Sequence, residues 1–181
     1  MSELHLLRHA KSSWADPDQP DRDRPLAPRG RRAARSVADH LRKRHPGIEL
    51  VLCSPAVRAV QTLDLLRPAL RDRVEVLVED ELYGAGATEL LARLQRVPDR
   101  VGSTLVVGHN PGLQELAVLL AREGRLRERA TAHFPTAILA TLALGKRPWS
   151  ALEPGGADLV SLVLARELRE VGHVRKPPAG M

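Results

Sequence analysis

Short apolar runs alternate with amphipathic segments along most of the chain, and this alternation constrains the fold more than any other feature. Apolar runs typical of buried strands cover residues 3–7, 48–54, 73–79, 103–108 and 136–144. Apolar residues at helical spacing predict helices over residues 28–44, 54–70, 88–97 and 110–123. Strand and helix therefore alternate four times, which predicts an α/β fold with three layers, α/β/α, around a mostly parallel central sheet.

The helix boundaries carry their own signals. Ser54 and Asn110 are expected as N-caps, with Pro55 and Pro111 just inside the helices that follow. Residues 149–170 fit either a strand or a helix, and both interpretations stay open.

The length of 181 residues suits one sizeable core, and the sequence contains no internal repeat or interdomain linker. We therefore expect a single domain over residues 1–170, followed by a disordered tail over residues 171–181.

The formal net charge of +6 favours anionic partners, which include phosphate groups, nucleic acid and anionic membrane surfaces. No apolar run reaches the ~18 residues that a membrane span needs, so we expect no membrane partner. The N-terminus lacks a secretory signal pattern, and Cys53, the single cysteine, cannot form an internal disulfide. These features predict a cytoplasmic protein.

A nucleic-acid-binding module is the alternative from a different class of function. The segments RDRPLAPRGRRAAR and HLRKRHPG are basic enough to suggest it. However, the chain has few of the aromatic residues on which single-stranded bases stack, and its arginines mostly alternate with acids. We therefore do not expect nucleic acid to be the partner.

Basic residues follow three of the predicted strands, where open α/β sheets bind their ligands. The first strand leads into Arg8 and His9, the second into a helix that carries Arg58, and the fourth into His109. Two arginines and two histidines near helix N-termini suit an anion with several oxygens, most obviously a phosphoryl group.

The charges of these residues predict a mechanism. Neighbouring cations disfavour an imidazolium, so Arg8 and Arg58 should keep His9 neutral and nucleophilic. We predict that His9 attacks phosphorus in line and forms a phosphohistidine intermediate, which water then hydrolyses. The arginines neutralise the oxygens of the transferred group. No metal or other cofactor is expected, and the histidines and carboxylates show no metal-ligand spacing.

The motifs LLRHAKSS, CSPAVRAVQT and VVGHNPG resemble the histidine phosphatase superfamily, and most closely its small SixA-type phosphohistidine phosphatases. DRPLAPRG and HFPTAILATL also match that branch. The resemblance implies a phosphoglycerate mutase-like fold and hydrolase activity, with His9 as the nucleophile and Arg8, Arg58 and His109 as the catalytic, phosphate-binding pocket. Ala10 replaces the superfamily's usual glycine, a change common in this branch.

The proton donor and the substrate stay open. Glu81, in EDELYGA, occupies roughly the place of the catalytic acid in relatives that act on sugar phosphates. Imidazole leaves more readily than an alkoxide, so such an acid matters less for phosphohistidine. The resemblance favours phosphohistidine on a protein as the substrate. A phosphomonoesterase acting on a small phosphorylated metabolite is the alternative.

Overall fold

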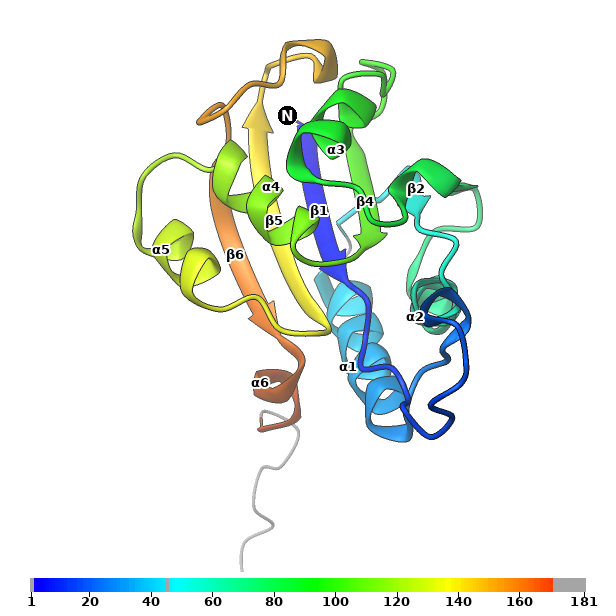
Figure 1. Ribbon diagram of the computed structural model, residues 1–181. Coiled ribbons are helices and arrows are strands. Elements are labelled where there is room, and N and C mark those ends of the chain that lie inside the picture. The colour runs from blue at the N-terminus through cyan, green and yellow to red at the C-terminus, as the bar shows by residue number, and fades with distance from the viewer. Residues whose placement is uncertain (1, 45, 171–181) are drawn as a thin grey trace, which may run out of the picture.

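A six-stranded sheet forms the centre of the protein in the computed structural model, which describes residues 2–44 and 46–170 (Figure 1). The strands are β1 (Ser2–Arg8), β2 (Leu50–Cys53), β3 (Glu75–Val78), β4 (Ser103–Gly108), β5 (Ile138–Gly145) and β6 (Asp158–Leu164). The helices are α1 (Pro28–Arg44), α2 (Val57–Leu66), α3 (Ala87–Leu94), α4 (Gly112–Leu120), α5 (Arg125–Ala132) and α6 (Ala165–Glu170).

The strand order is β3-β2-β4-β1-β5-β6. The first four strands in this order run parallel, whereas β5 pairs antiparallel with both β1 and β6. The predicted α/β class and mostly parallel sheet are therefore confirmed, with an antiparallel pair added at one edge.

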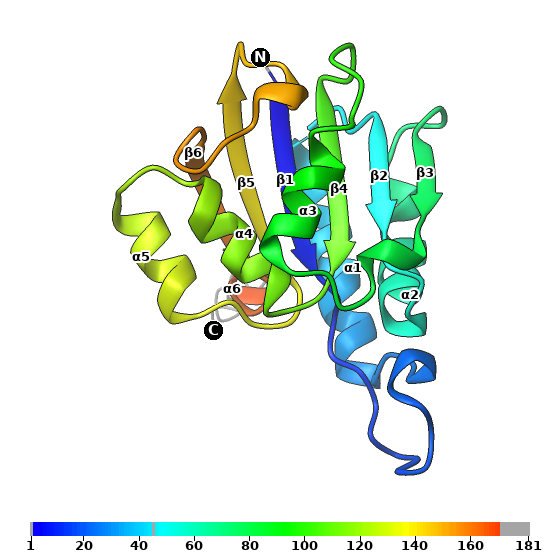
Figure 2. The ribbon, with the colours of Figure 1, turned by 45° about the horizontal axis from the view of Figure 1, so that its top comes forward.

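Helices cover both faces of the sheet, as the continuous apolar strands predict. Leu90 of α3 and Leu113 of α4 belong to one buried cluster, and Val37 of α1 and Leu63 of α2 belong to another. Helices α1 and α2 cover one face of the sheet, and α3 and α4 cover the other. The connections that leave the neighbouring strands β1 and β4 therefore turn to opposite faces at the same edge of the sheet. Figure 2 shows the arrowheads of β1 to β4 pointing to that edge. Such a switch point is the usual ligand site of an open α/β sheet.

The predicted helix caps are wrong. Helix α2 begins at Val57 with Ala56 as its N-cap residue, and α4 begins at Gly112 after Pro111. Ser54 and Asn110 do not cap these helices, because the helices begin at Val57 and Gly112, with Ala56 and Pro111 in the N-cap positions. The Ser54 hydroxyl accepts from the backbone N–H of Ala56 and lies against His109, and the Asn110 amide donates to the carbonyl of Phe134.

The C-terminal third contains two features that the apolar pattern left undecided. Helix α5 is short and largely polar, with only Ala130 buried, so it has almost no apolar periodicity. Residues 149–170 hold a short 3₁₀ turn, then β6 and α6. The expected tail over residues 171–181 lies outside the described residues. Among the residues that are described, no helix is long and apolar enough to cross a membrane.

Candidate active site

His9 follows β1 directly and is 7 % exposed. Its Nδ1 lies 2.7 Å from the carbonyl oxygen of Ala10, which can only accept a hydrogen bond. Nδ1 therefore carries the ring proton, and Nε2 carries the lone pair. The Nε–H of Arg58 donates to this Nε2 at 3.3 Å. The fold thus presents His9 as a neutral ring whose unprotonated nitrogen faces a guanidinium.

The charge state of His9 follows from its surroundings. Burial lowers the pKa of His9 to about 3, and the positive charges of Arg58 and Arg8 act in the same direction. The hydrogen bond to Ala10 opposes this shift without reversing it. The predicted neutrality of His9 is confirmed in direction, although burial rather than the arginines is its main cause.

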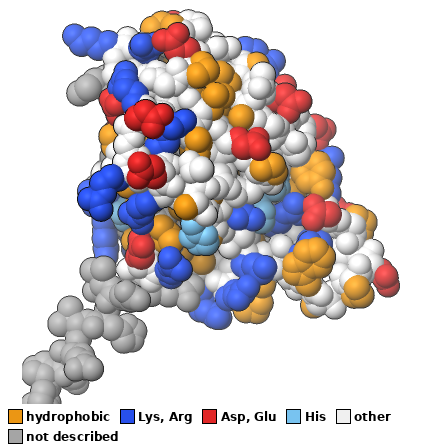
Figure 3. All heavy atoms as spheres, turned by 60° about the vertical axis from the view of Figure 1, so that its left-hand side comes forward, with side chains coloured by type: hydrophobic (Ala, Val, Ile, Leu, Met, Phe, Trp, Pro, Cys, Tyr) orange, Lys and Arg blue, Asp and Glu red, His pale blue; other side chains and the backbone are white. Residues whose placement is uncertain are grey.

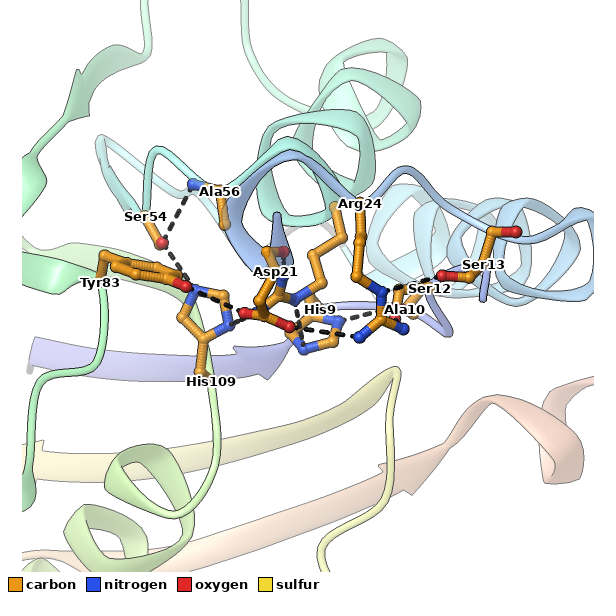
Figure 4. Close-up of polar contacts among 11 residues, drawn as sticks. His9, Ala10, Ser12, Ser13, Asp21, Arg24, Ser54, Ala56, Tyr83 and His109 are labelled. Carbon is orange, nitrogen blue, oxygen red and sulfur yellow. Dashed lines mark hydrogen bonds and ion pairs between the residues drawn. The ribbon is translucent and has the colours of Figure 1, made fainter. Parts of the chain in front are cut away.

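Arg58 is the second residue of α2 and is buried, and it contacts both histidines. One of its terminal nitrogens is 3.5 Å from Nδ1 of His109 and 2.8 Å from the carboxylate of Asp21. The second terminal nitrogen donates to the backbone oxygen of Asp21. Figure 4 shows Asp21 between Tyr83 and His9, at the centre of this group.

Asp21 is an anion in this position. Partial burial acts to raise the pKa of Asp21, but hydrogen bonds from Arg58 and Tyr83 outweigh it and hold the pKa below its usual value. The Tyr83 hydroxyl donates to Asp21 Oδ2 at 2.9 Å, and Arg24 approaches Oδ1 at 3.2 Å. The carboxylate of Asp21 therefore already occupies hydrogen-bond donors that a bound anion would use.

His109 follows β4, and its ring centroid lies 5.0 Å from that of His9. Its Nε2 lies 2.6 Å from the hydroxyl oxygen of Ser54, and the opposite nitrogen faces Arg58. Burial, followed by the charge of Arg58, lowers the pKa of His109 to about 4. His109 is thus neutral at physiological pH, with the lone pair of Nδ1 turned toward Arg58.

Arg8 ends β1 immediately before His9, and its charge lowers the pKa of both His9 and His109. It donates to the carbonyl of Phe134 at 2.8 Å, while its buried Nε has no acceptor among the described residues. Three of the four pocket residues expected from the sequence, His9, Arg58 and His109, are therefore in direct contact, and Arg8 lies beside them.

Glu81 forms its ion pairs with arginines other than those of the candidate site. Its half-exposed carboxylate pairs with Arg96 and lies 3.4 Å from Arg93, both beyond the loop that follows β3. No contact joins Glu81 to His9, Arg58 or His109 among the described residues. Its role as a proton donor stays a prediction.

Two further residues, Thr62 and Arg24, position the site, and sequence reasoning did not find Thr62. The Thr62 hydroxyl accepts from the backbone N–H of Ala10 and donates to the carbonyl of Arg58, so it ties both halves of the site together. Arg24 is 4 % exposed and closes the long loop after β1 by donating to Ser13 and Ser12. The available signals were the motif CSPAVRAVQT, which ends in Thr62, and the motif DRPLAPRG, which contains Arg24. Neither motif indicates which groups these side chains contact.

Asp21 was also missed. It lies among the aspartates of ADPDQPDRD, and only the position of this loop over the strand ends distinguishes it from its neighbours.

Comparisons with known proteins agree with this fold and site. Residues 4–89 match the sequence profile of the histidine phosphatase superfamily (branch 1). An uncharacterized protein of Mycobacterium tuberculosis is 39 % identical over 167 residues, which cover 88 % of this chain and all of that protein. A protein of Mycobacterium leprae is 36 % identical over 168 residues.

Solved structures give the same family. A Nakamurella multipartitia protein assigned as a phosphohistidine phosphatase SixA is 33 % identical and superposes with a TM-score of 0.77, covering 90 % of this chain and 95 % of its own. The protein histidine phosphatase SixA complexed with tungstate is 26 % identical, with a TM-score of 0.76 over 92 % of this chain and 99 % of that one. This chain belongs to the histidine phosphatase superfamily, and its structure is SixA-like. Membership supports a phosphatase, that is, a hydrolase.

Proposed function

We propose that this protein is a metal-independent phosphatase that removes the phosphoryl group from phosphohistidine on another protein, with His9 as the nucleophile. The observation that carries this proposal is the hydrogen bond from His9 Nδ1 to the Ala10 carbonyl, at 2.7 Å. It leaves the lone pair on Nε2, at the nitrogen that Arg58 approaches to 3.3 Å.

The reaction has two displacements at phosphorus. In the first, the Nε2 lone pair of His9 attacks phosphorus, the bond from phosphorus to the substrate nitrogen breaks, and the leaving imidazole takes a proton from solvent. In the second, water attacks the phosphoryl group on His9 and gives up a proton to solvent, the bond from phosphorus to Nε2 breaks, and inorganic phosphate leaves. Nδ1 of His9 keeps its proton throughout, hydrogen-bonded to the Ala10 carbonyl, so His9 returns to its starting tautomer.

The charge of the transferred group is neutralised by guanidiniums in this proposal. Arg58 lies against Nε2 of His9, and the buried Nε of Arg8 is an available donor. Positive groups already aimed at the phosphoryl oxygens lower the barrier without a metal ion. His109 would donate from Nδ1 once a bound phosphate dianion raises its pKa and it takes up a proton.

Three observations support phosphohistidine as the substrate. The most similar solved structures described above are SixA proteins, one of them holding tungstate, a tetrahedral oxyanion. Phosphohistidine has a good leaving group, which needs little help from a general acid. The carboxylate of Glu81, the candidate acid, is paired with Arg96.

The test uses wild type, His9→Ala and His40→Ala, with rapid quenching at high pH after mixing with a phosphohistidine-bearing protein. We expect acid-labile phosphate on wild type and on His40→Ala, whose histidine lies outside the site. We expect none on His9→Ala. Labelled phosphate on His9→Ala would overturn the assignment of the nucleophile.

A panel of sugar phosphates separates the alternative substrate class. A phosphomonoesterase would hydrolyse the sugar phosphates faster than phosphohistidine, and Glu81→Gln would lower that turnover severely. Hydrolysis of the sugar phosphates alone would keep the His9 chemistry and remove the phosphohistidine assignment.

A further inference from the structure

A hollow of about 230 Å³ lies beside the candidate active site, and we call it the basic hollow. Its rim carries the side chains of Lys11, Arg29, His133 and Arg166, and its floor includes Pro135 and the buried Leu164. The residues come from the loop after β1, the first turn of α1, the segment before β5 and the start of α6. Distant parts of the sequence thus build one depression.

The basic hollow is joined directly to the residues around the nucleophile. The backbone N–H of Ala137 approaches the carbonyls of Arg8 at 3.0 Å and of His9 at 3.2 Å, and Phe134 accepts from Arg8. His133 and Pro135, on either side of Phe134, line the basic hollow. Lys11 is two residues from His9, a span of at most ~7 Å of extended chain. A polypeptide that presents a phosphohistidine to His9 can therefore reach the hollow with neighbouring residues.

The described residues supply no carboxylate that neutralises the charge of the basic hollow. Lys11, Arg29 and Arg166 form no ion pair with any described residue, and no carboxylate lines the hollow within the described part of the chain. Other arginines of the same surface are neutralised, such as Arg129, which lies 4.0 Å from Glu167 of α6. Figure 3 shows blue side chains gathered along the lower part of this face, with few red ones among them. Uncompensated cations around an apolar floor favour an acidic polypeptide with an apolar side chain among its acids.

We propose that the basic hollow binds acidic residues that flank the phosphohistidine of a protein substrate; this inference rests on the proposed function and specifies its substrate class. The hollow would select protein substrates with acidic flanks over small phosphorylated molecules, because a small molecule bound at His9 does not extend past Lys11. The chain's own residues 171–181 are a poor occupant by charge, since they include Arg175 and Lys176 and no acid.

The test compares two synthetic phosphohistidine peptides that differ only in their flanks, acidic in one and Gln/Asn in the other. The enzymes are wild type, Arg29→Glu/Arg166→Glu and the control Arg32→Glu. Arg32 is exposed on the same helix as Arg29 and lies outside the hollow. Para-nitrophenyl phosphate reports on the catalytic centre alone.

We expect the double variant to lose about tenfold in kcat/KM for the acidic peptide, mainly through KM. Its activity on the neutral peptide and on para-nitrophenyl phosphate should stay near the wild-type values, and Arg32→Glu should change none of the three. Higher salt should reduce the wild-type preference for the acidic peptide. Equal losses on both peptides, or no loss on the acidic one, would overturn the inference.

A binding arm separates this inference from the proposed function. The unphosphorylated acidic peptide, carrying a fluorophore, is titrated with wild type and with the double variant at low salt. If wild type released phosphate from neither phosphohistidine peptide, the proposed function would be refuted. Weaker binding of the acidic peptide to the double variant would still support the hollow as an acidic-peptide site. Equal binding to both proteins would refute the hollow itself.

Discussion

The carboxylate of Asp21 lies 2.8 Å from a terminal nitrogen of Arg58, so the guanidinium assigned to the phosphoryl group already holds an anion. The same carboxylate accepts from the Tyr83 hydroxyl at 2.9 Å. A substrate phosphoryl group must therefore displace Asp21 from Arg58 or share this arginine with it. Asp21 is ionised at neutral pH, which makes it a competitor of phosphate rather than a proton donor.

Asp21→Asn should tighten the binding of inorganic phosphate. The amide keeps the shape of the side chain and removes the charge that competes for Arg58, which is an effect of about 1 kcal/mol, or about fivefold in the inhibition constant. The measurement is inhibition of para-nitrophenyl phosphate hydrolysis by phosphate. Asp23→Asn is the matched control, because Asp23 is an exposed carboxylate of the same 3₁₀ turn with no ion pair among the described residues. Weaker inhibition of Asp21→Asn would show that Asp21 assists anion binding.

Arg58→Lys should reduce kcat/KM by a factor of about 10² to 10³, although the positive charge is kept. Arg58 contacts His9, His109 and Asp21 with different nitrogens, and a lysine ammonium cannot span these positions. Steady-state kinetics measure the loss, and circular dichroism checks the fold. Arg67→Lys is the control, since Arg67 follows the same helix and, among the described residues, pairs only with exposed Asp64. Activity within a few-fold of wild type would contradict the central role of Arg58.

The free energy of unfolding should fall as the pH decreases from about 6.5 to about 4. Burial lowers the pKa of His5 to about 4, of His9 to about 3 and of His109 to about 4. An unfolded histidine has a pKa near ~6.5, so the unfolded state binds more protons throughout this window. Stability is therefore full above pH ~6.5 and is lost on acidification, at up to ~1.4 kcal/mol per pH unit for each histidine.

Urea unfolding across this pH range measures the slope. His109→Asn should reduce the slope, because one of the three histidines whose pKa is lowered is then absent from both states. An unfolding free energy that stays constant between about pH 6.5 and about pH 4.5 would show that these histidines are protonated in the fold.

Gly30→Ala should destabilise the protein by about 1 to 3 kcal/mol, although alanine is the better helix former by about 1 kcal/mol. Gly30 is in the first turn of α1, and a Cβ there would lie 2.2 Å from the carbonyl oxygen of Lys11. That atom belongs to the backbone that leaves His9, so the clash should also lower kcat. Urea unfolding and steady-state kinetics measure the two effects. A more stable Gly30→Ala protein would mean that α1 and the loop after β1 separate readily.

The positions of the pocket residues were predictable because the ends of the strands can be predicted from the sequence. Parallel strands deliver their carboxyl ends to one edge, so Arg8, Arg58 and His109 could be placed near His9 from the order of apolar runs alone. The family resemblance added the roles expected of these residues. The predicted caps at Ser54 and Asn110 failed because the helices begin a few residues later than the local pattern indicates, at Val57 and Gly112. The polar helix α5 was missed because it has little apolar periodicity to detect.

The amino-acid sequence by itself determined the α/β architecture and the group of basic side chains at one edge of the sheet, since both follow from local periodicity and strand direction. A neutral His9 was also predicted, but only the tertiary structure decided the main cause of its neutrality and the pairing of these side chains. Burial makes His9 and His109 neutral, the Ala10 carbonyl selects the His9 tautomer, and a loop brings Asp21 to Arg58 across 37 residues of sequence. Burial and long-range contacts depend on how the whole chain packs, and no spacing of residues along the sequence encodes them directly.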